Sequence, residues 1–215
     1  MNEQETSMAL ASFLLQIKAI KLNPANPFTW ASGLKSPIYC DNRVTLSYPQ
    51  VRTFIREGFK NMCLDKFGTP DVIAGVATGG IPQGALVAQE LGLPFVYVRS
   101  DKKSHGMNDQ VEGIINSGQS VVIIEDLVST GKSSLNAVEA LREKGAVIKG
   151  MLAIFTYGMD VATENFKNNK CELFTLTNYN TLVQKAAEES YIREDDLASL
   201  MEWKKDPQAW SDARM

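Results

Sequence analysis

The sequence predicts an α/β domain in which a mainly parallel sheet is flanked by helices. Short runs of apolar, mostly β-branched residues alternate with longer segments whose apolar residues recur at helical spacing. Strands that are buried on both faces read as continuous apolar runs, which is typical of a parallel sheet between helix layers. The length of 215 residues suits one domain with a well-buried core, and we expect residues 1–215 to form it.

The N-terminal part is expected to begin with a helix and to continue irregularly. Residues 3–21 are expected to be helical, because Leu10, Leu14 and Ile17 recur at the spacing of one helix face. Residues 22–46 are rich in Pro, Asn and Gly, so we expect turns and short strands there.

A second helix is expected after this irregular stretch. Ser47 and Gln50 have the spacing of a capping box, and Pro49 suits the first turn. The helix is expected to stop near Gly68. Its apolar positions are Val51, Phe54, Ile55, Phe59 and Met62.

The rest of the chain alternates between strands and helices. Strands are expected at residues 71–76, 95–99, 121–126, 147–155 and 171–176, and helices at residues 81–91, 133–144 and 193–205. Gly92 and Gly145 are expected to close the first two of these helices. Because such sheets bind ligands beyond the carboxyl ends of their strands, the loops after the strands are the candidate site.

Composition excludes several classes of function. The net charge of −3 gives no sign of a nucleic-acid or membrane-surface partner. The three cysteines, Cys40, Cys63 and Cys171, are odd in number and widely spaced, which fits a reducing cytoplasm rather than a disulfide framework. The acidic N-terminus does not resemble a signal peptide. A cytoplasmic location is therefore expected.

The most informative segment runs over residues 121–134. An apolar strand ends in two carboxylates, Glu125 and Asp126, and a loop of small residues then opens a helix. Backbone N–H groups near a helix N-terminus attract phosphate. The two carboxylates can accept ribose hydroxyls or support Mg²⁺, directly or through water. The expected phosphate-binding residues after them are Leu127, Val128, Ser129, Thr130, Gly131, Lys132 and Ser133.

Two other interpretations of this segment stay open. Gly131 and Lys132 resemble part of a Walker A loop, but that pattern needs a glycine at position 126, where this chain has Asp126. The segment can also be a strand, turn and helix without a ligand. Two adjacent acids at a buried strand end disfavour this, because unpaired buried charge is costly.

The same segment resembles the signature of type I phosphoribosyltransferases, which bind phosphoribosyl pyrophosphate (PRPP). In both, an apolar strand is followed by two acids and a short Ser/Thr/Gly loop. The resemblance implies the type I phosphoribosyltransferase fold, a parallel sheet flanked by helices with a small N-terminal hood. It also implies that residues 125–133 bind PRPP, and that Glu125 and Asp126 lie near Mg²⁺.

A basic loop spans residues 99–110 and holds Arg99, Lys102, Lys103 and His105, the last being the only histidine. A cationic loop can close over a pyrophosphate leaving group and exclude water. Taken alone, it can equally be a solvated hairpin tip.

The basic loop fits the R-x-x-x-K-x-H-G pattern of the catalytic loop in orotate phosphoribosyltransferases. The resemblance implies that Arg99, Lys103 and His105 act in catalysis together with Asp126, and that Lys102 also contacts PRPP. In that family the loop reaches into the neighbouring subunit's site, so a homodimer is implied.

Residues 28–43 resemble the F-T-x-x-S-G-x-K-S-P-x-Y segment of orotate phosphoribosyltransferases. There it forms part of the hood over the base, which we expect from about residues 1–46 and part of the C-terminal region. Some branches have lysines where Ala31 and Gly79 stand and an arginine near Tyr157. The candidate orotate-binding residues are therefore Lys35, Tyr39, Arg43 and Ser129.

A glycine-rich turn, Thr78-Gly79-Gly80, follows one strand and opens a helix. Its backbone amides suit pyrophosphate, although it can also be a simple tight turn.

Taken together, the resemblance implies transfer of the phosphoribosyl group of PRPP to orotate, giving orotidine 5′-phosphate and pyrophosphate. The alternatives are transfer to another base or a non-catalytic PRPP sensor.

Overall fold

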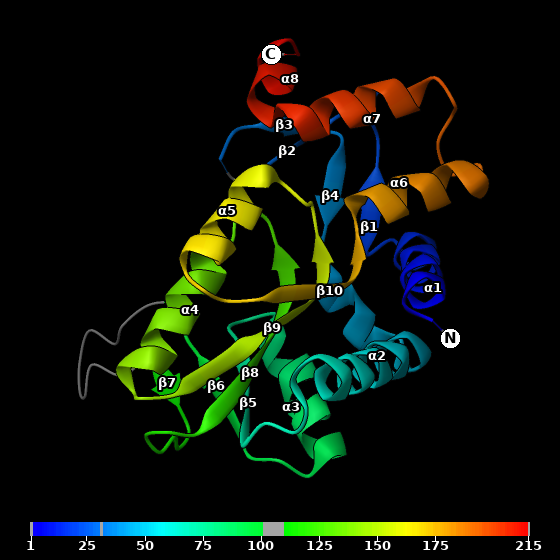
Figure 1. The fold of residues 1–215 in the computed structure, drawn as a ribbon. Coiled ribbons are helices and arrows are strands. Elements are labelled where there is room, and N and C mark those ends of the chain that lie inside the picture. The colour runs from blue at the N-terminus through cyan, green and yellow to red at the C-terminus, as the bar shows by residue number, and fades with distance from the viewer. Residues whose placement is uncertain (1, 31, 101–109, 215) are drawn as a thin grey trace.

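A six-stranded sheet forms the centre of the molecule in the computed structural model, which describes residues 2–30, 32–100 and 110–214 (Figure 1). The strand order is β10-β9-β8-β5-β6-β7, and every pair is parallel except β6 with β7. The expected mainly parallel sheet is therefore confirmed. Its strands are β5 (Val72–Val76), β6 (Phe95–Val98), β7 (Val111–Glu112), β8 (Ser120–Val128), β9 (Val147–Thr156) and β10 (Leu173–Asn178).

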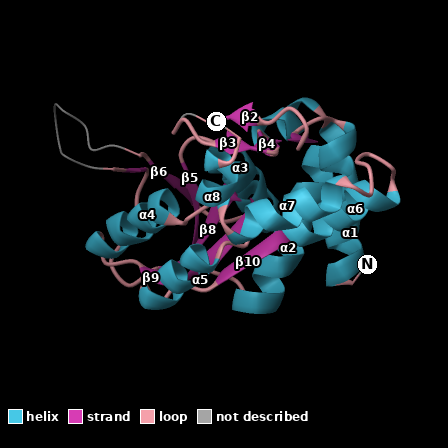
Figure 2. Cartoon of the chain, turned by 90° about the horizontal axis from the view of Figure 1, so that it is seen from above, coloured by secondary structure: helices cyan, strands magenta, loops and turns pink. Residues whose placement is uncertain are grey.

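Helices cover both faces of this sheet, as Figure 2 shows from above. The helices are α1 (Glu3–Gln16), α2 (Pro49–Phe67), α3 (Gly80–Leu91), α4 (Lys132–Glu143), α5 (Asp160–Asn168), α6 (Tyr179–Glu188), α7 (Asp196–Lys205) and α8 (Pro207–Asp212). One core lies between the sheet and helices α1, α2, α3 and α6, and the other lies between the sheet and helices α4 and α5.

Strand β8 shows why the sheet needs both layers. Val122 and Ile124 face the first core, whereas Val121 and Ile123 face the second, and all four are fully buried. Burying one such side chain stabilises the fold by about 1.5–3 kcal/mol. The continuous apolar run in the sequence follows from burial on both sides.

The hood lies beyond the carboxyl ends of the strands (Figure 1). It contains two small antiparallel pairs, β1 (Ile20–Leu22) with β4 (Ile38–Cys40) and β2 (Phe28–Thr29) with β3 (Lys35–Ser36), and the 3₁₀ helix η1 (Asn42–Ser47). Helices α7 and α8 pack beside these strands. Trp30 links the hood strands to the end of β9 and to α7, because its ring contacts those of Tyr157 and Trp203.

Two expectations for the N-terminal part are wrong in detail. The first helix ends at Gln16 rather than at residue 21, because Lys18 has a φ of 57° and turns the chain into β1. The capping box at Ser47 is absent, since Ser47 belongs to η1 and the residue that precedes α2 is Tyr48. Tyr48 precedes α2 without a side-chain cap, although Pro49 does occupy the first turn.

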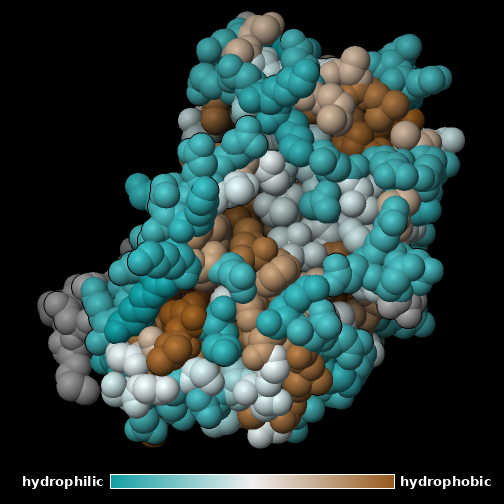
Figure 3. All heavy atoms as spheres, viewed as in Figure 1, coloured by the Kyte–Doolittle hydropathy of each residue, from teal (hydrophilic) through white to brown (hydrophobic). Residues whose placement is uncertain are grey.

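The surface seen in Figure 3 is mainly polar, with apolar residues showing between the helices. In the part of the chain that the structure describes, no helix combines the length and the apolar character needed to cross a bilayer.

Candidate active site

The predicted phosphate loop lies at the carboxyl end of β8, under the hood. Strand β8 continues to Val128, two residues beyond the expected end, so the loop itself is only Ser129 to Gly131 before α4 begins at Lys132. Gly131 has a φ of 80°, which favours glycine, and a Cβ there would lie 2.7 Å from the ring of Phe166. The loop therefore adopts a tight turn that this sequence permits.

Helix α5 supports this loop from the side. The Nδ2 of Asn165 donates a hydrogen bond of 2.9 Å to the backbone oxygen of Thr130, and Phe166 packs behind Gly131. Ser129 is half-buried and Gly131 is buried, while Thr130, Lys132 and Ser133 are exposed. The first-turn N–H groups of α4 have no partners within the helix, which leaves them suited to an anion.

The two carboxylates of the acidic pair have different surroundings. Glu125 is 5% exposed, and its carboxylate accepts hydrogen bonds of 2.9 Å from the Ser134 hydroxyl and from the Asp126 backbone N–H. Burial, together with the nearby charge of Asp126, raises the pKa of Glu125 well above its usual range. In this structure Glu125 joins the strand end to the first turn of α4.

Asp126 is the more accessible of the pair. It is half-buried, and burial raises its pKa, although the charge of Arg43 acts in the opposite direction. Its backbone oxygen accepts a 2.7 Å hydrogen bond from the Nδ2 of Asn42, which is buried in η1. The hood thus fixes the backbone at the end of β8.

The glycine-rich turn after β5 packs directly against this strand end. A Cβ on Gly79 would overlap the Asp126 carboxylate, and one on Gly80 would overlap the backbone oxygen of Ile124. Two glycines are therefore needed for this close approach. It brings Thr78, which is exposed, to the same edge of the sheet as Asp126, so the two predicted segments form one site.

A cavity of about 330 Å³ opens beside the loop. Of the predicted orotate-binding residues, Tyr39 and Ser129 line it. The Nζ of Lys35 donates a 2.9 Å hydrogen bond to Thr29, and Thr29 lines the cavity. Arg43 forms an ion pair with Asp41 instead. The lining consists of Thr29, Trp30, Tyr39, Cys40, Leu127, Ser129 and Tyr157.

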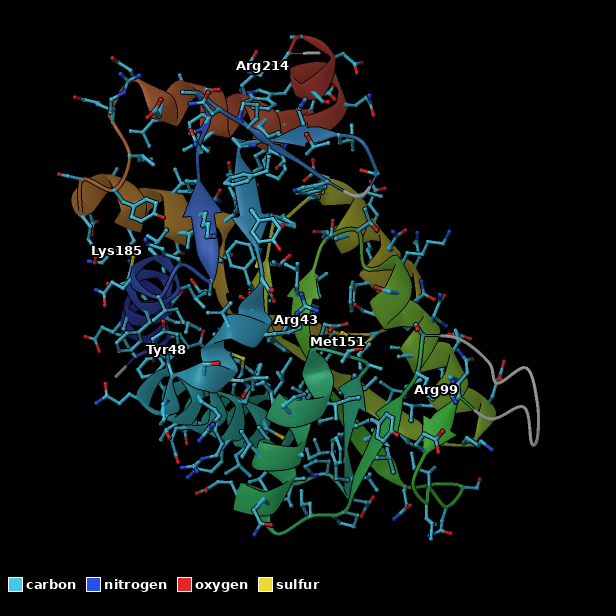
Figure 4. The ribbon with its side chains drawn as sticks, turned by 180° about the vertical axis from the view of Figure 1, so that it is seen from behind. Arg43, Tyr48, Arg99, Met151, Lys185 and Arg214 are labelled. Atoms are coloured by element: carbon cyan, nitrogen blue, oxygen red, sulfur yellow. The ribbon has the colours of Figure 1, made fainter. Side chains whose placement is uncertain are left out.

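The basic loop is described only at its ends. Arg99 and Gln110 are joined by a backbone hydrogen bond of 2.9 Å, and a guanidinium nitrogen of Arg99 lies 3.5 Å from a Glu112 carboxylate oxygen. Figure 4 places Arg99 at the edge of the sheet and Arg43 over the carboxyl ends of the central strands. The predicted roles of Lys102, Lys103 and His105 lie outside the described residues.

The sequence predictions missed several residues of the cavity and its supports. Trp30, Cys40 and Tyr157 were not predicted to line the cavity, although all three lie in or beside segments that the motifs single out. The supporting roles of Asn42, at the end of β8, and of Asn165, at the loop, were not predicted, because each contact joins elements far apart in the sequence.

The comparisons with known proteins identify the family of the chain. The Phosphoribosyl transferase domain family matches residues 47–183. An orotate phosphoribosyltransferase of Phocaeicola vulgatus is 59% identical over 200 residues, covering 93% of this chain and 94% of that protein. The chain belongs to the orotate phosphoribosyltransferase family. The resemblance expected from the motifs is thereby confirmed.

Other members of the orotate phosphoribosyltransferase family extend this result. The protein of Listeria innocua is 53% identical over 201 residues, covering 94% of this chain and 96% of that one. The crystal structure of orotate phosphoribosyltransferase from Aeropyrum pernix superposes with a TM-score of 0.75 at 28% identity, covering 83% of this chain and 98% of that one. The expected fold is therefore confirmed.

Proposed function

We infer that the chain transfers the phosphoribosyl group of PRPP to orotate, giving orotidine 5′-phosphate and pyrophosphate. The observation that carries this inference is the position of Ser129, which both begins the phosphate loop and lines the cavity. A base in the cavity and a 5′-phosphate on the loop are then bound side by side. Family membership, with relatives above 50% identity over almost the whole chain, supports orotate as the base.

In the proposed reaction, a ring nitrogen of orotate attacks the anomeric carbon as pyrophosphate leaves. Positive charge develops on the ribosyl group, and Asp126 is the accessible carboxylate of the acidic pair at the strand end. The turn at Thr78 to Gly80 offers backbone N–H groups for the pyrophosphate. Arg99, Lys103 and His105 stay the predicted partners of the leaving group. No covalent intermediate is proposed, and transfer is direct.

The donors in the site fit Mg²⁺ held largely by the substrate. Among the described residues, no group of three or more His, Cys, Asp or Glu side chains forms a metal site. Mg²⁺ commonly takes one or two carboxylates and keeps phosphate and water ligands. Asp126 is the carboxylate suited to this role, directly or through water, because Glu125 is bonded to Ser134. When bound, the ion would neutralise charge on the pyrophosphate.

The proposed setting is a homodimer in a reducing cytoplasm. Cys40, Cys63 and Cys171 are free in the structure, which supports a reducing compartment. The ends of the basic loop leave the β6–β7 edge of the sheet, so the loop starts two strands away from β8. That position is consistent with a loop that serves a neighbouring subunit.

A direct assay tests the function. Purified protein, PRPP and Mg²⁺ are mixed with orotate, and we expect loss of the orotate absorbance together with equimolar release of pyrophosphate. Uracil and purine bases in the same assay are expected to be poor acceptors. Transfer to one of those bases in preference to orotate, or binding of PRPP without any turnover, would overturn the proposal.

A further inference from the structure

The cavity beside Ser129 lacks an obvious partner for a negatively charged base. Its seven lining residues include none with a positively charged side chain. Orotate differs from uracil by a carboxylate, and burying that group without a hydrogen-bonded partner is costly. Cys40 and Tyr157 also bring no charge at neutral pH, because burial raises the pKa of the thiol and of the phenol well above their usual ranges. Among the described residues, a positive charge that could select orotate has to be sought just outside the lining.

The hairpin of β2 and β3 supplies a candidate. Thr29 and Lys35 lie directly opposite each other in this antiparallel pair. The Nζ of Lys35 donates a 2.9 Å hydrogen bond to the Oγ1 of Thr29, which lines the cavity. An ammonium group has three donors, so two remain for a ligand. The ammonium charge of Lys35 therefore lies next to the cavity, separated from it by the hydroxyl group of Thr29.

The backbone of Lys35 is held in place from the other side. Its N–H donates a 2.9 Å hydrogen bond to the Oγ of Ser211, which is 1% exposed in α8. Ser36, the next residue, is fully buried. The side chain of Lys35 is left free to adjust beyond its hydrogen bond to Thr29, which lines the cavity.

Three other described cations near the hood, Arg43, Lys21 and Lys132, are less suited. Two guanidinium nitrogens of Arg43 bond the carboxylate of Asp41 at 2.7 and 3.0 Å. The Nζ of Lys21 lies 6.0 Å from the ring centre of Tyr39, on the β1–β4 pair. Lys132 begins α4 on the phosphate side of the loop. Lys35, by contrast, has no ion pair with any described carboxylate and directly bonds a lining residue.

We propose that Lys35, oriented by Thr29, binds the carboxylate of the pyrimidine and so determines the preference of the enzyme for orotate over uracil. This inference rests on the proposed function. The ammonium forms charge-assisted hydrogen bonds to the carboxylate oxygens, while the aromatic lining contacts the ring. Lys35 acts on binding of the base and takes no part in proton transfer.

The test compares two nucleotides that differ only in this carboxylate. Orotidine 5′-phosphate and uridine 5′-phosphate are measured as inhibitors competing with PRPP, for the wild type and for Lys35→Met. Loss of a hydrogen bond to a charged group weakens orotidine 5′-phosphate by about tenfold. Uridine 5′-phosphate is expected to bind as before. Lys35→Arg keeps the charge and is expected to restore most of the preference.

Two matched variants separate the proposal from simpler explanations. Lys149→Met removes a charge from an exposed position at the far end of β9 and is expected to leave both constants unchanged. Thr29→Val removes only the hydroxyl and is expected to reduce the preference part of the way. Equal weakening of both nucleotides by Lys35→Met, or an unchanged ratio, would overturn the proposal. Failure of the wild type to convert orotate would instead refute the proposed function.

Discussion

At the scale of single residues, the adjacent acids of the candidate site are not equivalent. Glu125 is buried and holds Ser134, so it fixes the start of α4 against the strand end. Asp126 remains accessible and touches the backbone of Gly79. The sequence pattern predicted two carboxylates with a shared role. The structure assigns one to the framework and leaves the other available to the substrate.

The raised pKa of Glu125 makes a prediction for stability. Near pH 4 this carboxyl is largely protonated in both states, and its burial costs little. As the pH rises above its ordinary value of 4.5, the unfolded chain loses the proton while the folded state retains it. The wild type should therefore lose free energy of unfolding with rising pH, relative to Glu125→Gln.

Urea unfolding of both proteins at a series of pH values checks this. The amide cannot accept both hydrogen bonds of Glu125, so a constant cost is expected in the variant at every pH. The informative quantity is how the difference between the two proteins changes with pH. A difference that is independent of pH would show that Glu125 titrates normally in the folded protein.

At the scale of elements, helix α5 forms part of the site without touching the cavity. Asn165 bonds Thr130, and Phe166 fills the space that Gly131 leaves open. The turn that is predicted to bind phosphate thus depends on a helix that begins almost thirty residues later in the sequence.

Asn165→Ala is therefore expected to weaken PRPP binding. Loss of one hydrogen bond costs about 1 kcal/mol of stability. Because the freed loop must be ordered by the substrate, we expect the KM for PRPP to rise by about three- to tenfold, with the KM for orotate little changed. Steady-state kinetics with each substrate varied in turn provide the measurement.

Asn168→Ala is the matched control on the same helix. Asn168 is exposed, so this variant should retain the wild-type KM for PRPP. If Asn165→Ala lowered the turnover number alone, the loop would not depend on this contact for binding.

Five of the six strands of the sheet were predictable, whereas the two-residue strand β7 was not, and the hood was predictable only in part. Strands such as β8 are buried on two faces, which leaves a continuous apolar run in the sequence. The hood strands span two or three residues, too few to show a period. Their positions depend on distant contacts, for example that of Lys35 with Ser211. The capping box predicted at Ser47 is wrong for a similar reason, because Ser47 is part of η1 and no pattern in the sequence indicated that short helix.

At the scale of the whole molecule, the proposed dimer predicts complementation between two defective proteins. Lys103→Ala removes a predicted contribution of the basic loop, and Asp126→Asn alters the receiving site. Each variant alone is expected to be nearly inactive. In a mixed dimer one site combines both changes and the other is intact. Since half of randomly exchanged dimers are mixed, about a quarter of wild-type activity should return.

Subunit exchange must be verified in the same samples by native mass spectrometry. No recovery of activity despite confirmed mixed dimers would place the loop in its own subunit's site. A monomer in sedimentation velocity at assay concentration would remove the shared site altogether.

The parts of the candidate site that lie in one continuous segment were predictable from the sequence. The parts that several elements form together were not. The phosphate loop follows β8 directly, so its residues were readable from consecutive positions. The cavity combines residues from the hood, β8 and the end of β9. Tyr157 and Trp30 come together through ring contacts that no local pattern encodes.

The bond between Ser211 and Lys35 joins positions 176 residues apart. Helix α8 therefore holds the β2–β3 hairpin in place from a distant part of the sequence. A fusion partner or purification tag attached next to α8 is expected to disturb the contact between Ser211 and Lys35. Helix α1, by contrast, begins away from the hood (Figure 1). If Lys35 selects orotate as we propose, helix α8 contributes to the choice between two pyrimidines by holding the backbone of Lys35.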